Sequence, residues 1–275
     1  MIPASFDYLR AASTAEALAL LAEHGPDAKI IAGGHSLLPL MKLRLASPSV
    51  LVDVARIEEL SYIRDAGDQV AVGALTRHCD LQRSALLRAE VPLLAHVAGA
   101  VGDPQVRHRG TIGGSLVHGD PASDLPAAVL ALGATLVVTG PAGPREVAAA
   151  DFFRGFLETA VEPDEMLTEI RVPKMEGAGW SFQKFNLRAQ DWAIVGVAAV
   201  GPQAGGGIAL VNMAATPVRA VAAEQAVAAG ASVDDAAASA SIGLEPPADR
   251  NASAAYRRHL ASVLVRRALR EIQAR

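Results

Sequence analysis

Two glycine pairs, each with a serine close behind, are the residues of this sequence best suited to bind a ligand. Gly33 and Gly34 follow the apolar run 29–32 and precede Ser36, and Gly113 and Gly114 precede Ser115. Glycine allows a left-handed backbone and lets a ligand approach the main chain, while the start of a helix presents free N–H groups. One such stretch could be an ordinary strand-to-helix turn. Two in one chain predict backbone amides that bind a phosphate or pyrophosphate.

The second pair lies in a long, punctuated segment, residues 102–126. This segment is too long and too rich in glycine for a simple connection, so we expect it to wrap a ligand. Thr111 and Ser115 add hydroxyl donors. Asp124 and Pro126 are placed like the cap and first turn of a helix that runs through residue 132.

Two groups of residues could suggest a metal site. His118, Asp120 and Asp124 are better interpreted as a hydrogen-bonding lining, because no third neutral ligand with suitable spacing follows. His78, Cys79 and Asp80 are consecutive on an expected helix, where neighbouring side chains point in different directions and cannot converge on one ion. We therefore predict no metal site, and the sequence also shows no clear catalytic His/Tyr constellation.

Composition excludes several classes of protein. The chain has 275 residues, 51% hydrophobic and 20% charged, with a net charge of −4 and one cysteine. It offers no basic surface for nucleic acid, and its one cysteine cannot build a disulfide framework or an all-cysteine iron–sulfur site. We see no signal peptide and no run long enough to span a membrane, so we expect a cytoplasmic protein.

The remaining pattern predicts the elements that position the glycine pairs. The segment 13–16 has the sequence of a capping box and opens a helix that Gly25 ends. Strands at 29–32 and 50–54 flank the first pair, with Ser36 capping the helix between them, which predicts a βαβ-type unit ending near residue 57. Further strands are expected at 69–75, 134–139 and 165–172, with Thr76 capping the helix after the first of these.

The pattern changes after residues 174–179, which contain glycine and polar residues typical of a domain boundary. Apolar or alternating runs then predict an antiparallel sheet of about three strands, at 180–187, 193–200 and 207–213. An alanine-rich helical tail follows. Its amphipathic part, 256–272, is expected to place Arg257 on a solvated face.

These motifs resemble the FAD-binding medium subunit of the molybdenum hydroxylases, the group that includes aerobic carbon monoxide dehydrogenase and xanthine dehydrogenase. The resemblance covers nearly the whole chain. It is carried by the segments 32–37, 103–107, 111–115 and 120–124, with further matches at Phe152-Phe153, Val172-Pro173, Phe182-Gln183-Lys184 and Thr216-Pro217-Val218-Arg219.

The resemblance implies an α+β fold: a vanillyl-alcohol-oxidase-type (PCMH-type) FAD-binding domain of two subdomains and a small C-terminal domain. The expected bounds are 1–176 for the FAD-binding domain, with subdomains of about 1–57 and 58–176, and 177–275 for a C-terminal domain of the carbon monoxide dehydrogenase flavoprotein type. The residues that match the family's FAD contacts are Ala32, Gly33, Gly34, His35, Ser36, Leu37, Thr111, Ile112, Gly113, Gly114, Ser115, Asp124, Leu167 and Lys184.

Individual roles follow from the same resemblance. Asp124 is suited to accept a hydrogen bond from a hydroxyl of the cofactor, and Leu167 would pack near the flavin. Lys184 would place positive charge near the flavin or be a solvated charge on a strand. Trp192 would lie beside the isoalloxazine ring or in the core, and is left outside the expected site.

The implied function is electron transfer. Electrons would pass from iron–sulfur clusters of a partner subunit through FAD to an external acceptor. The molybdenum cofactor and the [2Fe–2S] clusters would lie only in a large and a small partner subunit, assembled as a dimer of heterotrimers. Two alternatives stay open: a self-sufficient FAD oxidase or dehydrogenase of a small substrate, and a flavin-binding scaffold without turnover.

Overall fold

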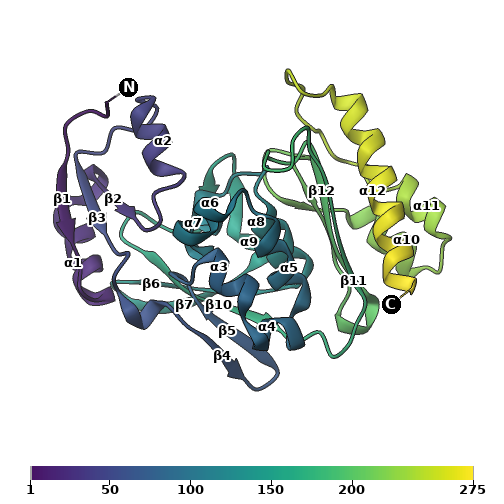
Figure 1. Cartoon of the computed structure of the whole chain (residues 1–275), viewed down its shortest axis with the longest axis horizontal. Coiled ribbons are helices and arrows are strands. Elements are labelled where there is room, and N and C mark those ends of the chain that lie inside the picture. The colour runs from purple at the N-terminus through teal and green to yellow at the C-terminus, as the bar shows by residue number, and fades with distance from the viewer. Residues whose placement is uncertain (1, 275) are drawn as a thin grey trace.

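A parallel three-stranded sheet forms the N-terminal part of the computed structural model, which describes residues 2–274 (Figure 1). Its strands are β1 (Asp7–Arg10), β2 (Ala28–Ile31) and β3 (Val50–Asp53), in the order β1-β3-β2. Helix α1 (Thr14–His24) connects β1 to β2, and α2 (Leu37–Lys42) lies between β2 and β3. Ser13 Oγ accepts from the Glu16 amide at 3.2 Å, so the predicted cap of α1 is confirmed.

A five-stranded antiparallel sheet occupies the middle of the chain. Its order is β4 (Ile63–Ala66), β5 (Gln69–Gly73), β10 (Met166–Pro173), β6 (Thr135–Gly140) and β7 (Gly143–Ala148). The central strand β10 therefore pairs with strands from two distant parts of the chain, and its register shifts between Leu167 and Glu169. A small hairpin, β8 (Phe153–Gly155) with β9 (Glu158–Thr159), precedes β10.

Seven helices separate or flank these strands, and most of them cover one face of the sheet (Figure 1). They are α3 (His78–Arg83), α4 (Ala85–Glu90), α5 (Pro92–Ala100), α6 (Pro104–Arg109), α7 (Ile112–His118), α8 (Asp124–Ala131) and α9 (Ala149–Phe152). Residues such as Leu94, Leu116 and Ile170 bury their side chains between helices and sheet. Burial of one such side chain contributes about 2 kcal/mol. This core fixes α7, which carries the second glycine pair.

A third sheet follows residue 179. Its order is β11 (Trp180–Phe185), β12 (Val195–Val200), β13 (Ile208–Val211) and β14 (Val218–Arg219), with every pairing antiparallel. The three predicted strands are present. The fourth, β14, has only two residues, too few to show an alternating pattern in the sequence.

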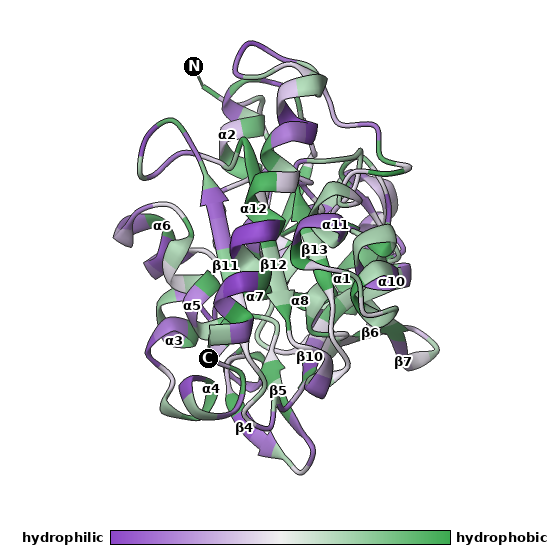
Figure 2. Cartoon of the chain, turned by 90° about the vertical axis from the view of Figure 1, so that its right-hand side faces the viewer, coloured by the Kyte–Doolittle hydropathy of each residue, from purple (hydrophilic) through white to green (hydrophobic). Residues whose placement is uncertain are grey.

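The third sheet is covered on one side by α10 (Val221–Ala228), α11 (Val233–Ala238) and α12 (Ala254–Ala274). Helix α12 alternates hydrophilic and hydrophobic residues along its length, whereas β12 and β13 are largely hydrophobic (Figure 2). Helix α8 packs against β12 and β13 from the middle part of the chain. The second and third sheets are therefore joined through α8.

Three local expectations are wrong. The segment 102–126 is not a wrapping loop, because Asp103 and Thr111 accept from the amides of Val106 and Gly114 and so start two short helices, α6 and α7. Thr76 does not cap α3, since its hydroxyl bonds to the main chain of Tyr62. Arg257 is fully buried rather than solvated.

The buried position of Arg257 has a clear cause. Its guanidinium donates to Asp249 Oδ2 at 2.6 Å and to the carbonyl of Ile194. A buried charge needs such partners, and a helical periodicity cannot reveal that a preceding loop supplies one. No helix within residues 2–274 has both the length and the hydropathy needed to cross a bilayer.

Candidate cofactor site

The two glycine stretches meet in the structure. A Cβ atom built on Gly33 would lie 2.3 Å from the carbonyl oxygen of Arg109 and 2.9 Å from the Cα of Gly110. These distances are below van der Waals contact, so only glycine allows the first stretch to pack against the chain just before Thr111. Residues 33–37 and 110–115, far apart in the sequence, therefore form one site.

The first stretch offers a row of free donors. Gly34 has φ of +76°, in the left-handed region. The backbone N–H groups of residues 33–37 have no hydrogen-bond acceptor within the described part of the chain. Successive free amides around a left-handed residue form a concave site for an anion. Such a row of free amides is suited to a pyrophosphate, and binding of one there stays a prediction.

One detail of the first stretch differs from the expectation. Ser36 occupies the position before α2, but its side chain makes no capping hydrogen bond. The reason is its helical backbone conformation, with φ of −97° and ψ of −50°, whereas a capping residue is usually extended. The Ser36 hydroxyl is therefore not used to hold α2.

The second stretch presents a different kind of surface. The amides of Ile112 and Gly113 donate to the carbonyls of Thr76 and Ala74, at 3.0 and 2.8 Å. The Gly114 amide donates to Thr111 Oγ1 at 3.2 Å. The amides of residues 112–114 therefore already have acceptors within the protein and are not free for a pyrophosphate.

What the second stretch offers is space and a hydroxyl group. A Cβ atom on Gly114 would meet only Thr111 Oγ1 within 4 Å, and Gly114 is exposed. The half-buried Ser115 follows on the same turn of α7. A ligand can therefore approach the main chain at Gly114, while α7 itself is held by its own hydrogen bonds.

Asp124 and Lys184, for which separate roles were expected, form a buried ion pair. Lys184 Nζ lies 2.6 Å from Asp124 Oδ2 and 3.3 Å from the carbonyl oxygen of Ala100. Ser123, not Asp124, holds the position before α8, again without a side-chain cap. Lys184 is thus no solvated charge, since its side chain is 12% exposed.

The second carboxylate oxygen of Asp124 is an unused acceptor. Asp124 Oδ1 is buried and has no hydrogen-bond partner among residues 2–274. Burial raises the pKa of Asp124 to about 6, although Lys184 acts in the opposite direction. An orphaned buried oxygen is the group expected where a hydroxyl of a bound molecule would donate.

Leu167 lies in the core. Its side chain is 4% exposed within the main hydrophobic cluster, on the strand that packs under α7. The structure therefore places it close to the helix of the second stretch, and a contact with the flavin stays a prediction.

Two groups that hold the site together were not expected to do so. One is the peptide between Arg109 and Gly110, against which Gly33 packs. The other is His78, considered above only as a metal ligand, which is buried beside Gly110 and whose pKa burial lowers to about 4. No periodicity in the sequence indicates which side chain lies behind Gly110. Within residues 2–274, no three His, Cys, Asp or Glu side chains are placed to hold a metal ion.

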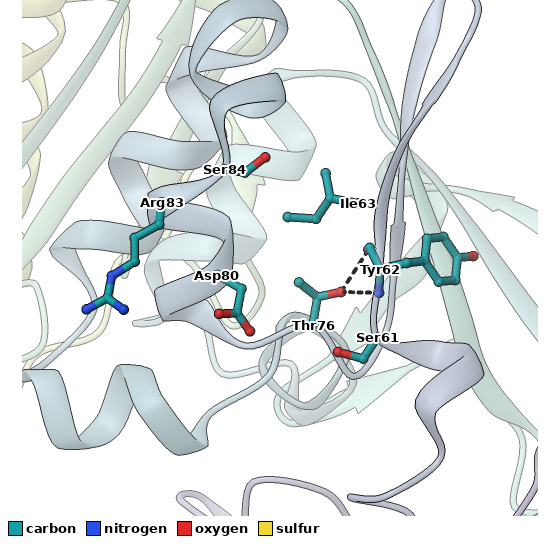
Figure 3. A pocket seen from close by; sticks show the side chains of 7 residues that line it. All are labelled: Ser61, Tyr62, Ile63, Thr76, Asp80, Arg83 and Ser84. Carbon is teal, nitrogen blue, oxygen red and sulfur yellow. Dashed lines mark hydrogen bonds between the residues drawn. The ribbon is translucent and has the colours of Figure 1, made fainter.

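Two hollows of the surface lie elsewhere. One, of about 390 Å³, lies between the start of β4 and α3, where the Thr76 hydroxyl bonds to Tyr62 (Figure 3). Another, of about 600 Å³, lies between the connector 176–179 and the C-terminal helices. None of the predicted cofactor residues lines either one. The glycine site is instead an open surface made largely of backbone.

Known protein families match this chain along almost its whole length. Residues 4–175 match the family described as the FAD binding domain in molybdopterin dehydrogenase, and residues 180–272 match the CO dehydrogenase flavoprotein C-terminal domain. The chain is 44% identical to the carbon monoxide dehydrogenase medium chain of Hydrogenophaga pseudoflava, covering 100% of this chain and 99% of that one. It is 37% identical to the glyceraldehyde dehydrogenase medium chain of Sulfolobus acidocaldarius, covering 99% and 100%.

A solved structure agrees in three dimensions. It is the carbon monoxide dehydrogenase from Hydrogenophaga pseudoflava that lacks the Mo-pyranopterin moiety of the molybdenum cofactor. The match has a TM-score of 0.95 at 44% identity and covers 100% of this chain and 99% of that one. Two family models, full-length relatives and a shared fold lead to one conclusion: this chain belongs to the family of FAD-binding medium chains of the molybdenum hydroxylases.

Proposed function

We propose that this chain is the FAD-binding electron-transfer subunit of a molybdenum hydroxylase, working between iron–sulfur clusters of a partner subunit and an external acceptor. The observation that carries the proposal is the contact between the two glycine stretches. It joins a row of free amides to the open face of Gly114 in a chain that aligns end to end with medium chains.

Different residues of the site would bind different parts of the cofactor. The amides of residues 33–37 would hold the pyrophosphate, and Gly114 with Ser115 would let it approach α7. Asp124 Oδ1 would accept from a cofactor hydroxyl, and Lys184 would keep that carboxylate charged and oriented. FAD, when bound, supplies the redox chemistry, and the protein supplies position and electrostatics.

The proposed partners are a large subunit with the molybdenum cofactor and a small subunit with [2Fe–2S] clusters, assembled as a dimer of heterotrimers in the cytoplasm. The one cysteine of this chain cannot ligate such clusters, which supports their placement in a partner. Medium chains similar to this one belong to enzymes named for carbon monoxide and for glyceraldehyde. That difference supports a substrate site outside this chain.

We also propose two domains, 1–176 and 177–275, with subdomains of about 1–57 and 58–176 in the first. Two residues at the boundary, Glu176 and Gly177, have positive φ. The two family matches end at residue 175 and begin at residue 180, which supports a boundary between them.

The proposal is tested by reconstitution. The purified chain should bind one FAD noncovalently, and acid precipitation should release all the yellow colour into the supernatant. Co-expressed with its partners, the chain should co-elute with a molybdenum protein and an iron–sulfur protein. Substrate should then bleach the flavin absorbance of the complex but not of the isolated chain. Bleaching of the isolated chain would favour a self-sufficient oxidase, and no FAD binding would contradict the proposal.

A further inference from the structure

A buried histidine lies beneath the point where the two glycine stretches meet. His78, the first residue of α3, is 4% exposed, and its Nδ1 has no partner within residues 2–274. Burial, reinforced by the nearby charges of His35 and Arg107, lowers its pKa to about 4, so the ring is neutral at pH 7. A buried polar atom without a partner costs stability, so the position of this ring calls for an explanation.

The main chain around His78 is the support of the second stretch. The amide of His78 donates to the carbonyl of Gly110 at 3.1 Å, and Arg77 forms an isolated antiparallel bridge with Thr111. Together with the bonds from residues 112 and 113 described above, residues 74–78 hold residues 110–113 along a short ladder. The backbone that carries the His78 ring is therefore hydrogen-bonded directly to the segment that contains Thr111.

The ring itself is packed against Gly110. A Cβ atom built on Gly110 would lie 2.7 Å from His78 Nε2 and 2.8 Å from its Cδ2. The backbone of Gly110, with φ of −62° and ψ of 144°, is one that any residue can adopt. The ring, and not the backbone conformation, is thus the main reason for glycine at this position.

Gly33 lies against the same peptide. A Cβ on Gly33 would be 2.3 Å from the carbonyl oxygen of Arg109 and 2.9 Å from Gly110 Cα. The peptide between Arg109 and Gly110 therefore contacts the first cofactor stretch and the His78 ring. A change in the size of the ring is passed through this peptide to Gly33, because tightly packed interiors transmit displacement.

We propose that His78 is a positioning residue of the cofactor site: its ring sets the place of the peptide between Arg109 and Gly110, and so the separation between the amides of residues 33–37 and Gly114. This inference rests on the proposed FAD site. His78 acts on the site through Gly110, so it is a positioning residue and not a ligand of the cofactor.

The test combines a larger residue at position 110 with a smaller one at position 78 in the full chain. Flavin fluorescence measures the dissociation constant of FAD for each apoprotein. Gly110→Ala should weaken FAD binding about tenfold or more, because its methyl group displaces the peptide from the ring. His78→Ala should also weaken it, about tenfold, by leaving the peptide unsupported. The double variant should bind FAD more tightly than either single variant, because the new methyl group fills part of the space left by the ring.

The matched control uses Gly33, whose Cβ would meet a backbone oxygen that no side-chain change removes. His78→Ala combined with Gly33→Ala should therefore show no rescue, and the two losses should multiply. Melting temperatures of the apoproteins separate folding from binding. If His78→Ala does not fold, His78→Asn, smaller than histidine and neutral, takes its place in the same cycle.

The outcomes separate the two proposals. Wild-type protein that fails to bind FAD contradicts the proposed function. Wild-type protein that binds FAD, with losses that simply multiply in the His78/Gly110 pair, overturns the role of His78 alone. Equal rescue in the His78/Gly33 pair also overturns the role of His78, because His78→Ala would then relax the packing around both glycines and not around Gly110 alone.

Discussion

Lys184 Nζ lies 2.6 Å from Asp124 Oδ2, and this buried ion pair joins strand β11 of the third sheet to helix α8 under the second. Removal of the ammonium group by Lys184→Met should destabilise the protein by about 3 kcal/mol or more at neutral pH, because a buried carboxylate is left without its counterion. Urea unfolding at several pH values measures this loss.

The pH dependence of that loss has a definite sign. The folded pKa of Asp124, about 6, lies above its value in an unfolded chain, so the stability linked to its proton is lost as pH rises through 6. Lys184→Met removes the group that lowers this pKa, so the loss should extend to higher pH and steepen the fall in stability between pH 6 and 8. The control Asp124→Leu with Lys184→Met should lack this dependence. A constant difference at all pH values would contradict the prediction.

The two neighbouring glycines of α7 should respond differently to the same change. Gly114→Ala brings its methyl group to 2.9 Å from a single side-chain atom, Thr111 Oγ1, so the melting temperature of the apoprotein should fall only slightly while FAD binding weakens about tenfold. Gly113→Ala would bring Cβ to 2.6 Å from the Ala74 carbonyl and should lower the melting temperature as well. Wild-type FAD affinity in Gly114→Ala would show that the second stretch does not contact the cofactor.

Two serines near helix starts should also differ. Ser13 caps α1, so Ser13→Ala should cost about 1 kcal/mol of unfolding free energy. Ser36 makes no cap, so Ser36→Ala should change the stability of the apoprotein by less than about 0.5 kcal/mol. Any loss of FAD affinity in Ser36→Ala then reports a contact of the hydroxyl with the ligand. A stability loss in Ser36→Ala as large as that of Ser13→Ala would contradict this account.

Two aspartates that pair with arginines of α12 give a comparison of buried and exposed ion pairs. Asp249→Ala leaves the fully buried Arg257 without its carboxylate and should cost about 2 kcal/mol. Asp234→Ala removes the partner of Arg266 and Arg270, both in contact with solvent, and should cost less than about 1 kcal/mol. Thermal or urea unfolding of the two variants measures the difference, and equal losses would argue against a structural role for Arg257.

Regular elements with strong local signals could be predicted from the sequence. Helix α1 begins after the predicted capping box and ends at Gly25, because Ser13 caps its first turn and Gly25 adopts a positive φ. The segment 102–126 was misjudged although Asp103-Pro104 is itself a helix start. The many glycines outweighed that signal in the prediction, but in the structure most of them pack against side chains, as Gly110 does against His78.

Several residues of the site could be predicted from the sequence, but the contacts between them could not. Gly33, Gly114 and Asp124 were named from sequence, but the pairing of Asp124 with Lys184 and the place of His78 depend on contacts between distant segments. Such contacts leave no periodic trace. Arg257 illustrates the same limit, since nothing in a helical pattern shows that Asp249 folds back onto it.

The central place of β10 has a consequence for how the protein is made. Both neighbours of β10 in the five-stranded sheet, β5 and β6, precede it in the chain, and Ala74 donates to the Thr168 carbonyl in β10. During synthesis the chain emerges from its N-terminus, so the sheet stays split until residue 173 has left the ribosome. Ala74 in turn accepts from the amide of Gly113. The strand that holds Ala74, and through it Gly113, is thus made only after both glycine stretches have been translated.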